Sequence, residues 1–301
     1  MSRIRLVLFD AFDTLITPRL PIHVQYAQEA HKHGFSESVI TPATVRSAFK
    51  PAFRKTTELF PEWGRHAEPK MSPSEWWMMC IEETMRMAGA EQSKLEEVMP
   101  RLGKALLDRF ESAEGYRAFD DVVPCCESPQ RAWIPYGKLT MNVVTQLKQA
   151  GVKTGLVSNA DDRILKTLDA LGITPLLSHG TTISQIAGYE KPDSRIFEAA
   201  CRTAGIESEV TEGATDKHDE NGEEHRQFQG VLMVGDEVEA DYHGAVSAGL
   251  EARLIRRPGD FSDGAKRVSE EEERETLHRD GVHVIRSLKE VMNEVKHRNG
   301  L

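Results

Sequence analysis

The feature that most constrains the fold is a regular alternation of short apolar runs with longer amphipathic stretches. The apolar runs are rich in Val, Ile and Leu, and they are residues 5–9, 153–157, 180–184, 230–234 and 251–255. Runs of this kind are typical of strands that are buried on both faces of a parallel sheet. The stretches between them have helical periodicity and end at glycines that suit helix ends, and they are residues 138–151, 162–172, 193–205 and 239–249. The alternation predicts an α/β fold with a doubly wound, Rossmann-like parallel sheet.

The first two predicted strands are more than a hundred residues apart, which is far more than a crossover needs. The intervening sequence has only helical patterns, at residues 23–34, 41–60, 73–89 and 94–110. We therefore predict an inserted α-helical cap domain at residues 17–132 and a core formed by residues 1–16 and 133–301. The acidic, polar residues 207–229 predict a flexible loop within the core.

The aromatic side chains of the predicted insert have two readings. They are Phe53, Phe60, Trp63, Trp76 and Trp77. We expect them to form the core of the insert, and the alternative is that they line a mouth over the site.

Composition excludes several classes of partner. The formal net charge of −10 argues against a nucleic-acid backbone or an anionic membrane as the main partner, since both reward clustered Lys and Arg. No apolar stretch approaches the length of a membrane span. We expect no signal peptide, because no N-terminal apolar run precedes a small-residue cleavage site. The 4 cysteines match neither a disulfide framework nor a zinc site, so we expect reduced thiols. We expect a cytoplasmic, or cytoplasmic and nuclear, protein that is a monomer or a weak homodimer.

Polar residues follow the predicted strands, where ligands bind in an open parallel sheet. They are Asp10, Phe12, Asp13 and Thr14 after the first strand, Ser158 and Asn159 after the second, Lys191 after the third, and Asp236 and Asp241 after the fourth. Carboxylates that meet at one point repel each other unless a cation lies there, and hard oxygen ligands suit Mg²⁺. A lysine and hydroxyl groups beside that ion suit an anion. The combination indicates a phosphoryl-transfer site with a small phosphorylated substrate.

The motifs around these residues resemble those of the haloacid dehalogenase-like (HAD) hydrolase superfamily. The matching segments are FDAFDTL, VSN, KPDSRIF and VGDEVEAD, in the order and approximate spacing of that family. The longer stretches SNADDR and GYEKPDSRIF are similar to the rhythmically-expressed-gene-2-like branch. The resemblance implies Mg²⁺-dependent hydrolysis of a small phosphate ester through an aspartyl-phosphate intermediate.

The resemblance also implies roles for individual residues. Asp10 would be the nucleophile, and Asp10, Ser158 and Lys191 would be the catalytic residues. The substrate would be bound by Thr14, Ser158, Asn159 and Lys191. The metal would be held by Asp10, the Phe12 carbonyl oxygen, Asp236 and Asp241.

One position departs from the family pattern. Phosphatases of the family usually carry a second Asp two residues after the nucleophile, and this chain has Phe12 there. A phenyl ring cannot transfer a proton, and general acid–base catalysis is typically worth about 10²–10⁴ in rate. We therefore expect slow turnover of alkyl esters and a smaller loss for aryl or acyl phosphates. Asp13 is expected to brace the turn, because one residue step changes the direction of a side chain; a compensating acid–base role is the alternative.

Two other functions remain open from the sequence. An aromatic residue at position 12 resembles the dehalogenases of the superfamily, which release halide and need no proton for the leaving group. Those enzymes lack the pattern seen in GDEVEAD, which favours phosphate as the substrate group. The third possibility is a HAD-fold protein with weak catalysis that serves as a binding or regulatory module.

Overall fold

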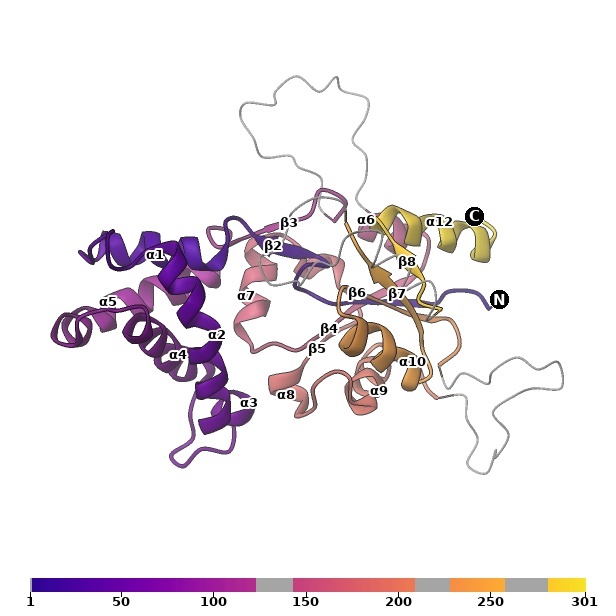
Figure 1. Cartoon of the computed structure of the whole chain (residues 1–301). Helices are drawn as coiled ribbons and strands as arrows, with labels where there is room; N and C mark the ends of the chain where they lie inside the picture. Colours follow the sequence, from indigo (N-terminus) through magenta and orange to yellow (C-terminus); the bar gives the residue numbers. More distant parts are fainter. Residues whose placement is uncertain (1, 123–142, 209–227, 258–280) are drawn as a thin grey trace, which may run out of the picture. The chain divides into compact units, whose positions relative to one another are not determined.

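The computed structural model describes residues 2–122, 143–208, 228–257 and 281–301 (Figure 1). The chain divides into two compact units. The core unit comprises Met1–Thr17, Ala118–Asn159 and Gly172–Leu301, and the helical unit comprises Pro18–Arg117 and Ala160–Leu171. The end of the predicted cap domain, most of the predicted acidic loop, and Cys125 and Cys126 lie outside the described residues. The predicted domain limits stay a prediction.

The core unit contains a sheet of parallel strands, as the sequence predicts, with the order β5-β4-β1-β6-β7-β8. Its strands are β1 (Leu6–Phe9), β4 (Lys153–Ser158), β5 (Thr181–Ile183), β6 (Val231–Gly235), β7 (Glu251–Ile255) and β8 (Val284–Ile285). In the register, Phe9 of β1 lies opposite Leu156 of β4 and Val234 of β6. The carboxyl ends of these three neighbouring strands therefore lie side by side. The predicted α/β fold with a Rossmann-like parallel sheet is confirmed.

Helices cover both faces of this sheet (Figure 1). The helices α9 (Ser194–Thr203) and α10 (Gly244–Ser247) lie on one face, and α6 (Val143–Gln149) and α12 (Leu288–Asn299) lie on the other. Shorter segments complete the unit: η2 (Thr174–Leu176), α8 (Ser184–Ala187) and the π-helical η3 (Val238–His243). The face covered by α9 buries Leu6, Leu8 and Met233 of the sheet against Ile196 and Phe197 of the helix. Removing these side chains from water supplies much of the stability that holds the strand ends in place.

The helical unit is built around an apolar core of its own. Its helices are α1 (Ile22–Lys32), α2 (Pro42–Leu59), α3 (Pro61–Gly64), α4 (Pro73–Met87), α5 (Gln92–Phe110) and α7 (Arg163–Ala170). The helices α2 and α4 begin at reciprocal capping boxes formed by Thr41 with Thr44 and by Ser72 with Glu75, which satisfy backbone groups at the helix start. The division between the units falls within the paired strands β2 (Ile16–Pro18) and β3 (Tyr116–Ala118).

An aromatic cluster lies between α2, α3 and α4. Phe53, Trp63, Trp76 and Trp77 pack on one another with ring centroids 5.0–6.4 Å apart. The indole N–H of the buried Trp76 donates to the Phe60 carbonyl oxygen at 2.8 Å. These side chains therefore pack together within the helical unit.

The helix α7 belongs to the helical unit. The indole N–H of Trp77 donates to Asp161 Oδ2 at 2.7 Å, and the Arg163 guanidinium lies 4.6 Å from the Trp77 ring. Arg163 Nε also donates to Asp161 Oδ1 at 2.8 Å. At the next turn, the Thr167 hydroxyl donates to the Phe110 carbonyl oxygen at 3.1 Å. Side-chain contacts of this kind cannot be read from a helical pattern alone.

Two further sequence predictions concern membranes and thiols. Among the helices in the described ranges, none is long and apolar enough to span a bilayer. Cys80 and Cys201 are buried free thiols, and burial raises the pKa of each to about 12. Both are therefore protonated and unreactive at neutral pH.

Candidate active site

The site is built from residues at the carboxyl ends of β1, β4 and β6. Asp10 directly follows β1, and its backbone N–H donates to the Val234 carbonyl oxygen of β6 at 2.9 Å. Ser158 is the last residue of β4, and Asp236 directly follows β6. Because β1 lies between β4 and β6, this order places Asp10 between the other two strand ends. The sheet therefore brings residues that are far apart in the sequence to one edge.

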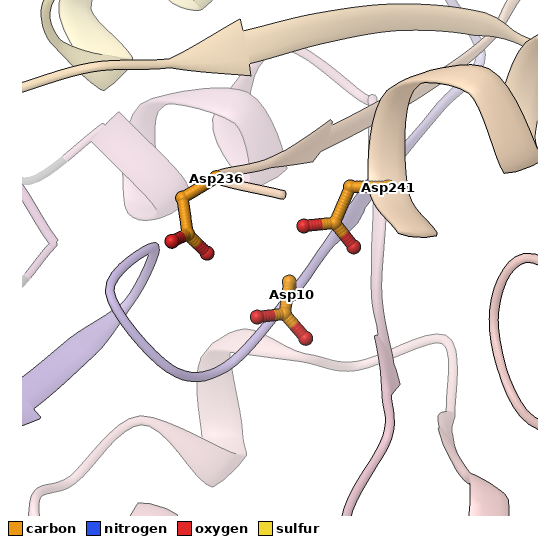
Figure 2. Close-up of side chains that lie close together, drawn as sticks. All are labelled: Asp10, Asp236 and Asp241. Atoms are coloured by element: carbon orange, nitrogen blue, oxygen red, sulfur yellow. The ribbon is translucent and has the colours of Figure 1, made fainter. Parts of the chain in front are cut away.

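Three carboxylates meet at this edge (Figure 2). Asp10, Asp236 and Asp241 each offer an oxygen atom, and these atoms all lie within 4.8 Å of one another. Burial and the nearby carboxylates, Asp10 first among them, raise the pKa of Asp236 to about 9. A cation bound beside Asp236 would favour its ionised form. Oxygen ligands at this spacing suit one divalent metal ion.

Gly235 makes room for this cluster. A Cβ atom at position 235 would overlap the carboxylate of Asp241. Asp241 is itself fixed, because its Oδ2 accepts the backbone N–H of Glu237 at 2.9 Å. The glycine in VGDEVEAD is therefore required by the position of a candidate metal ligand.

Lys191 is a buried cation between two of the carboxylates. Its ammonium group donates to Asp10 Oδ1 at 2.7 Å and to Asp241 Oδ1 at 2.6 Å, and also to the Val157 carbonyl oxygen at 3.0 Å. Burial alone would lower the pKa of Lys191, but Asp10 and Asp241 together raise it above its ordinary value. Burial raises the pKa of Asp241 to about 6, with Lys191 acting in the opposite direction. Lys191 therefore stays charged and offsets part of the negative charge of the cluster.

Asn159 fixes the main chain of Lys191. Its Nδ2 donates to the Lys191 carbonyl oxygen at 2.9 Å, and the Lys191 backbone N–H donates to its Oδ1 at 2.7 Å. The sequence resemblance implied a substrate-binding role for Asn159, and the structure places its amide group against Lys191.

Two hydroxyl groups that follow or end the strands β1 and β4 are buried and make no hydrogen bond within the described residues. Thr14 is 0% and Ser158 is 1% exposed. Within the part of the chain that the structure describes, neither Thr14 Oγ1 nor Ser158 Oγ has a hydrogen-bond partner. Buried polar atoms almost always have such a partner, so the two hydroxyl groups are suited to a ligand that brings acceptor oxygens.

The turn after Asp10 has an unusual conformation. Asp13 has a φ of 51°, which is uncommon for any residue other than glycine. Its backbone N–H donates to the Ile16 carbonyl oxygen at 2.7 Å, and its Oδ1 accepts the Thr17 hydroxyl at 2.9 Å. The Asp13 carboxylate thus braces the turn. The neighbouring Phe12 is half-buried, and its side chain has no group that could transfer a proton.

Two adjacent arginines, which the sequence analysis did not single out, reach the loops that carry the carboxylates. Arg256 donates from Nη1 to the Asp236 carbonyl oxygen, and Arg257 donates from Nη1 to the Asp13 carbonyl oxygen at 3.2 Å. The Arg257 guanidinium also donates to Asp121 Oδ1 at 2.9 Å. Contacts between residues so distant in sequence have no local signal.

Two curated relatives align with nearly the whole chain. A haloacid dehalogenase-like hydrolase domain-containing protein 3 from Bos taurus is 26% identical over 265 residues, which cover 88% of this chain and 86% of the relative. The Rhythmically expressed gene 2 protein of Drosophila melanogaster is 23% identical over 255 residues, which cover 85% of this chain and 84% of the relative. Both relatives agree with the resemblance stated from the motifs.

Solved structures share the fold. A 2-haloacid dehalogenase from Pseudomonas syringae pv. Tomato DC3000 has a TM-score of 0.53 and 19% identity, with coverage of 98% of this chain and 99% of the other. The magnesium-bound HAD-hydrolase YfnB from Bacillus subtilis has a TM-score of 0.51 and 17% identity, with the same coverage of both chains. The family model for haloacid dehalogenase-like hydrolases matches residues 4–249. Together with the strand order and the residues at the strand ends, this match means that the chain belongs to the haloacid dehalogenase-like hydrolases.

Proposed function

We propose that this hydrolase is a Mg²⁺-dependent phosphatase that acts on a small phosphate ester with Asp10 as the nucleophile. The observation that carries the proposal is that the charged groups near Asp10 are paired with one another, whereas two buried hydroxyl groups have no partner in the part of the chain that the structure describes. Lys191 is paired with two of the three clustered carboxylates, whereas the buried hydroxyl groups of Thr14, after β1, and Ser158, at the end of the neighbouring β4, have no hydrogen-bond partner in the described residues. A tetrahedral phosphoryl group offers the oxygen atoms that those hydroxyl groups lack.

The metal would be held by Asp10, Asp236 and Asp241, with the Phe12 carbonyl oxygen as a further ligand. The spacing of the carboxylates and the raised pKa of Asp236 fit a bound cation. The related fold of YfnB binds magnesium, which supports Mg²⁺ as the ion. When bound, the ion would supply positive charge against the phosphoryl oxygens.

The residues of the chain would act in two steps. In the first, a carboxylate oxygen of Asp10 attacks phosphorus, and the bond from phosphorus to the leaving oxygen breaks. In the second, a water molecule attacks the phosphorus of the aspartyl phosphate, which releases inorganic phosphate and restores Asp10. Thr14 and Ser158 would donate to the phosphoryl oxygens in both steps. Lys191 would keep its positive charge beside Asp10 and the transferring group, and Asn159 would hold Lys191 in place.

Phe12 determines which esters are hydrolysed quickly. It provides no proton for the leaving oxygen, and the Asp13 carboxylate is engaged with Thr17. An alkoxide leaves slowly without a proton, whereas an aryl oxide or, from an acyl phosphate, a carboxylate is stable enough to leave without one. The substrate class with the fastest turnover is therefore an aryl or acyl phosphate.

The test is phosphate release from a chromogenic aryl phosphate, with and without Mg²⁺. We expect release that requires Mg²⁺ in the wild type and that disappears in Asp10→Asn. Asp13→Asn is the matched control, because Asn tolerates a positive φ and its Oδ1 can still accept the Thr17 hydroxyl. It should keep turnover near that of the wild type. Unchanged release in Asp10→Asn would remove Asp10 as the nucleophile.

A dehalogenase is the second candidate, since Phe12 suits a reaction without a leaving-group proton. In that reaction Asp10 would attack carbon and expel halide, and water would hydrolyse the resulting ester. The carboxylate cluster argues for phosphate, because halide displacement has no need of a divalent cation. Halide release from a 2-haloacid without Mg²⁺ would favour this candidate. Absence of both activities together with tight binding of a partner would favour a binding or regulatory role.

A further inference from the structure

Arg257 connects the turn after Asp10 to a distant part of the core unit. Its Nη1 donates to the Asp13 carbonyl oxygen, and its Nη2 donates to Asp121 Oδ1 at 2.9 Å. The guanidinium carbon also lies 3.8 Å from the centre of the Phe119 ring. The side chain is 8% exposed, so these contacts are shielded from solvent.

Asp121 is itself held firmly. Its Oδ2 accepts the Ser287 hydroxyl at 3.0 Å and the Leu288 backbone N–H at 2.9 Å, which are at the start of α12. A carboxylate at the start of a helix is stabilised by the backbone N–H groups there. Arg257 is thus anchored at one end to a fixed carboxylate and at the other end to the active-site turn.

The turn that Arg257 reaches is the one that must be placed accurately. It begins at the nucleophile Asp10 and contains Phe12, whose carbonyl oxygen is a candidate metal ligand, and Thr14, whose hydroxyl is free for the substrate within the described residues. Asp13 in this turn has a φ of 51°, a left-handed conformation that is unfavourable for an L-residue. Such a conformation persists only where several contacts hold it. Thr17 holds the Asp13 side chain, and Arg257 holds its carbonyl oxygen.

We propose that Arg257 is a positioning residue of the active site, which holds the Asp13 carbonyl oxygen so that the turn presents Asp10, Phe12 and Thr14 to the metal and the phosphoryl group. The inference rests on the proposed function. This positioning role requires both terminal nitrogens of the guanidinium, because Nη1 donates to the Asp13 carbonyl oxygen and Nη2 donates to Asp121. A lysine keeps the charge but cannot form this fork.

The experiment compares Arg257→Lys with Arg253→Lys in the full chain. Arg253 is a matched control, because it lies on β7, is 9% exposed and pairs with a carboxylate, Glu294. Within the described residues, the contacts found for Arg253 are with Glu251, Glu294 and the Ala252 carbonyl oxygen, which lie outside the active-site turn. Mg²⁺ affinity is measured by titration calorimetry with Mg²⁺ alone, turnover is measured with the aryl phosphate at saturating Mg²⁺, and folding is checked by thermal melting.

We expect Arg257→Lys to weaken Mg²⁺ binding and to lower kcat, each by about 10–100-fold, the range found for residues that orient metal ligands. Because lysine keeps the positive charge, a loss of Mg²⁺ affinity and kcat in this variant would come from a displaced active-site turn and not from a change in charge. Arg253→Lys should lower the melting temperature and leave both quantities within about two-fold of the wild type. If Arg257→Lys does not fold, Asp121→Asn takes its place, since it weakens the anchor and leaves the bond to Asp13, and a smaller loss in the same direction is expected.

Two outcomes overturn the inference. One is a folded Arg257→Lys with wild-type Mg²⁺ affinity and kcat, and the other is an equal loss in Arg253→Lys. A wild type that binds Mg²⁺ but releases no phosphate would contradict the proposed function alone, since the calorimetric comparison still tests Arg257. A wild type that does not bind Mg²⁺ overturns both.

Discussion

Asn159 and Lys191 are joined by two reciprocal hydrogen bonds, in which the side-chain amide of one residue pairs with the backbone of the other. The pairing links the end of β4 to the segment that delivers the buried ammonium group to Asp10. The two hydrogen bonds thus join two residues that are 32 positions apart in the sequence.

Asn159→Ala should lower both stability and turnover. Loss of two hydrogen bonds of about 0.5–1.5 kcal/mol each lowers the free energy of unfolding by about 1–3 kcal/mol. Because Lys191 loses its backbone support, kcat should fall by about ten-fold or more. Denaturant unfolding and aryl phosphate turnover measure the two effects.

Asn299→Ala provides the control for that variant. Asn299 forms the same reciprocal pair with the backbone of Ile4, with both distances at 2.9 Å, just before β1 and away from the carboxyl ends of the strands. It should lose similar stability and keep its kcat. An equal loss of kcat in both variants would contradict the positioning role of Asn159.

Stability of the metal-free protein should fall as pH rises from about 6 to 9. Burial and its acidic neighbours raise the pKa of Asp236 from 3.8 to about 9, so the folded state keeps a proton that the unfolded chain has already lost. The unfolding free energy therefore decreases with pH across that interval. Mg²⁺ binds the deprotonated carboxylates, so the stabilisation by Mg²⁺ should grow over the same range.

Thermal melting with EDTA and with Mg²⁺ at pH 6, 7.5 and 9 tests this expectation. Asp236→Asn should flatten the pH dependence of the metal-free protein, because the titrating group is gone. A Mg²⁺-induced shift in melting temperature that is the same at pH 6 and pH 9 would be inconsistent with the cluster as the metal site.

Phe12→Asp should increase the rate at which the enzyme hydrolyses alkyl phosphates. A carboxyl group at this position could protonate the leaving oxygen, which is worth about 10²–10⁴ in rate for a poor leaving group. The gain for an aryl phosphate should be much smaller, so the ratio of aryl to alkyl turnover should fall. Phe12→Asn is the control, because Asn is close in size to Asp but has no acidic proton. This variant should show neither the gain in alkyl phosphate turnover nor the fall in the ratio of aryl to alkyl turnover. Equal rates in the Asp and Asn variants would mean that the proton is not what position 12 lacks.

Gly235→Ala should displace Asp241 and weaken Mg²⁺ binding. The added methyl group overlaps the Asp241 carboxylate, and overpacking of this kind costs about 1–3 kcal/mol of stability. Gly155→Ala is the control, because a Cβ atom there approaches Leu8 and the Gly180 carbonyl oxygen instead. Calorimetry should show weaker Mg²⁺ binding in the first variant and unchanged binding in the second.

The fold was largely predictable because its strands are buried on both faces. Continuous apolar runs identified β1, β4, β5, β6 and β7, and the structure has each of them within about two residues of the expected ends. The strand β8 consists only of Val284 and Ile285, which is too short to produce a pattern. The start of the helix predicted at 239–249 is π-helical, and hydrophobic periodicity does not distinguish a π-helix from an α-helix.

The candidate site was predictable to the extent that its residues follow strands. Asp10, Ser158 and Asp236 directly end or follow predicted strands, so the sheet alone brings them to one edge. Arg257 was not predictable, because its partners Asp13 and Asp121 lie far away in the sequence. The amide of Asn159 could equally have faced a ligand, and only the position of the Lys191 backbone shows what it binds.

The docking of α7 on α4 has a consequence for modularity. The chain passes between the two units at 17–18, 117–118, 159–160 and 171–172, so the helical unit is not a single continuous insertion. Excision of residues 18–117 would remove Trp77, which donates to Asp161 and packs under the Arg163 guanidinium. The helix α7 would then lack the other helices of its unit. Replacement of the helical unit of this chain would therefore need residues 18–117 and 160–171 to be moved together, because these two distant stretches of sequence form one structural part.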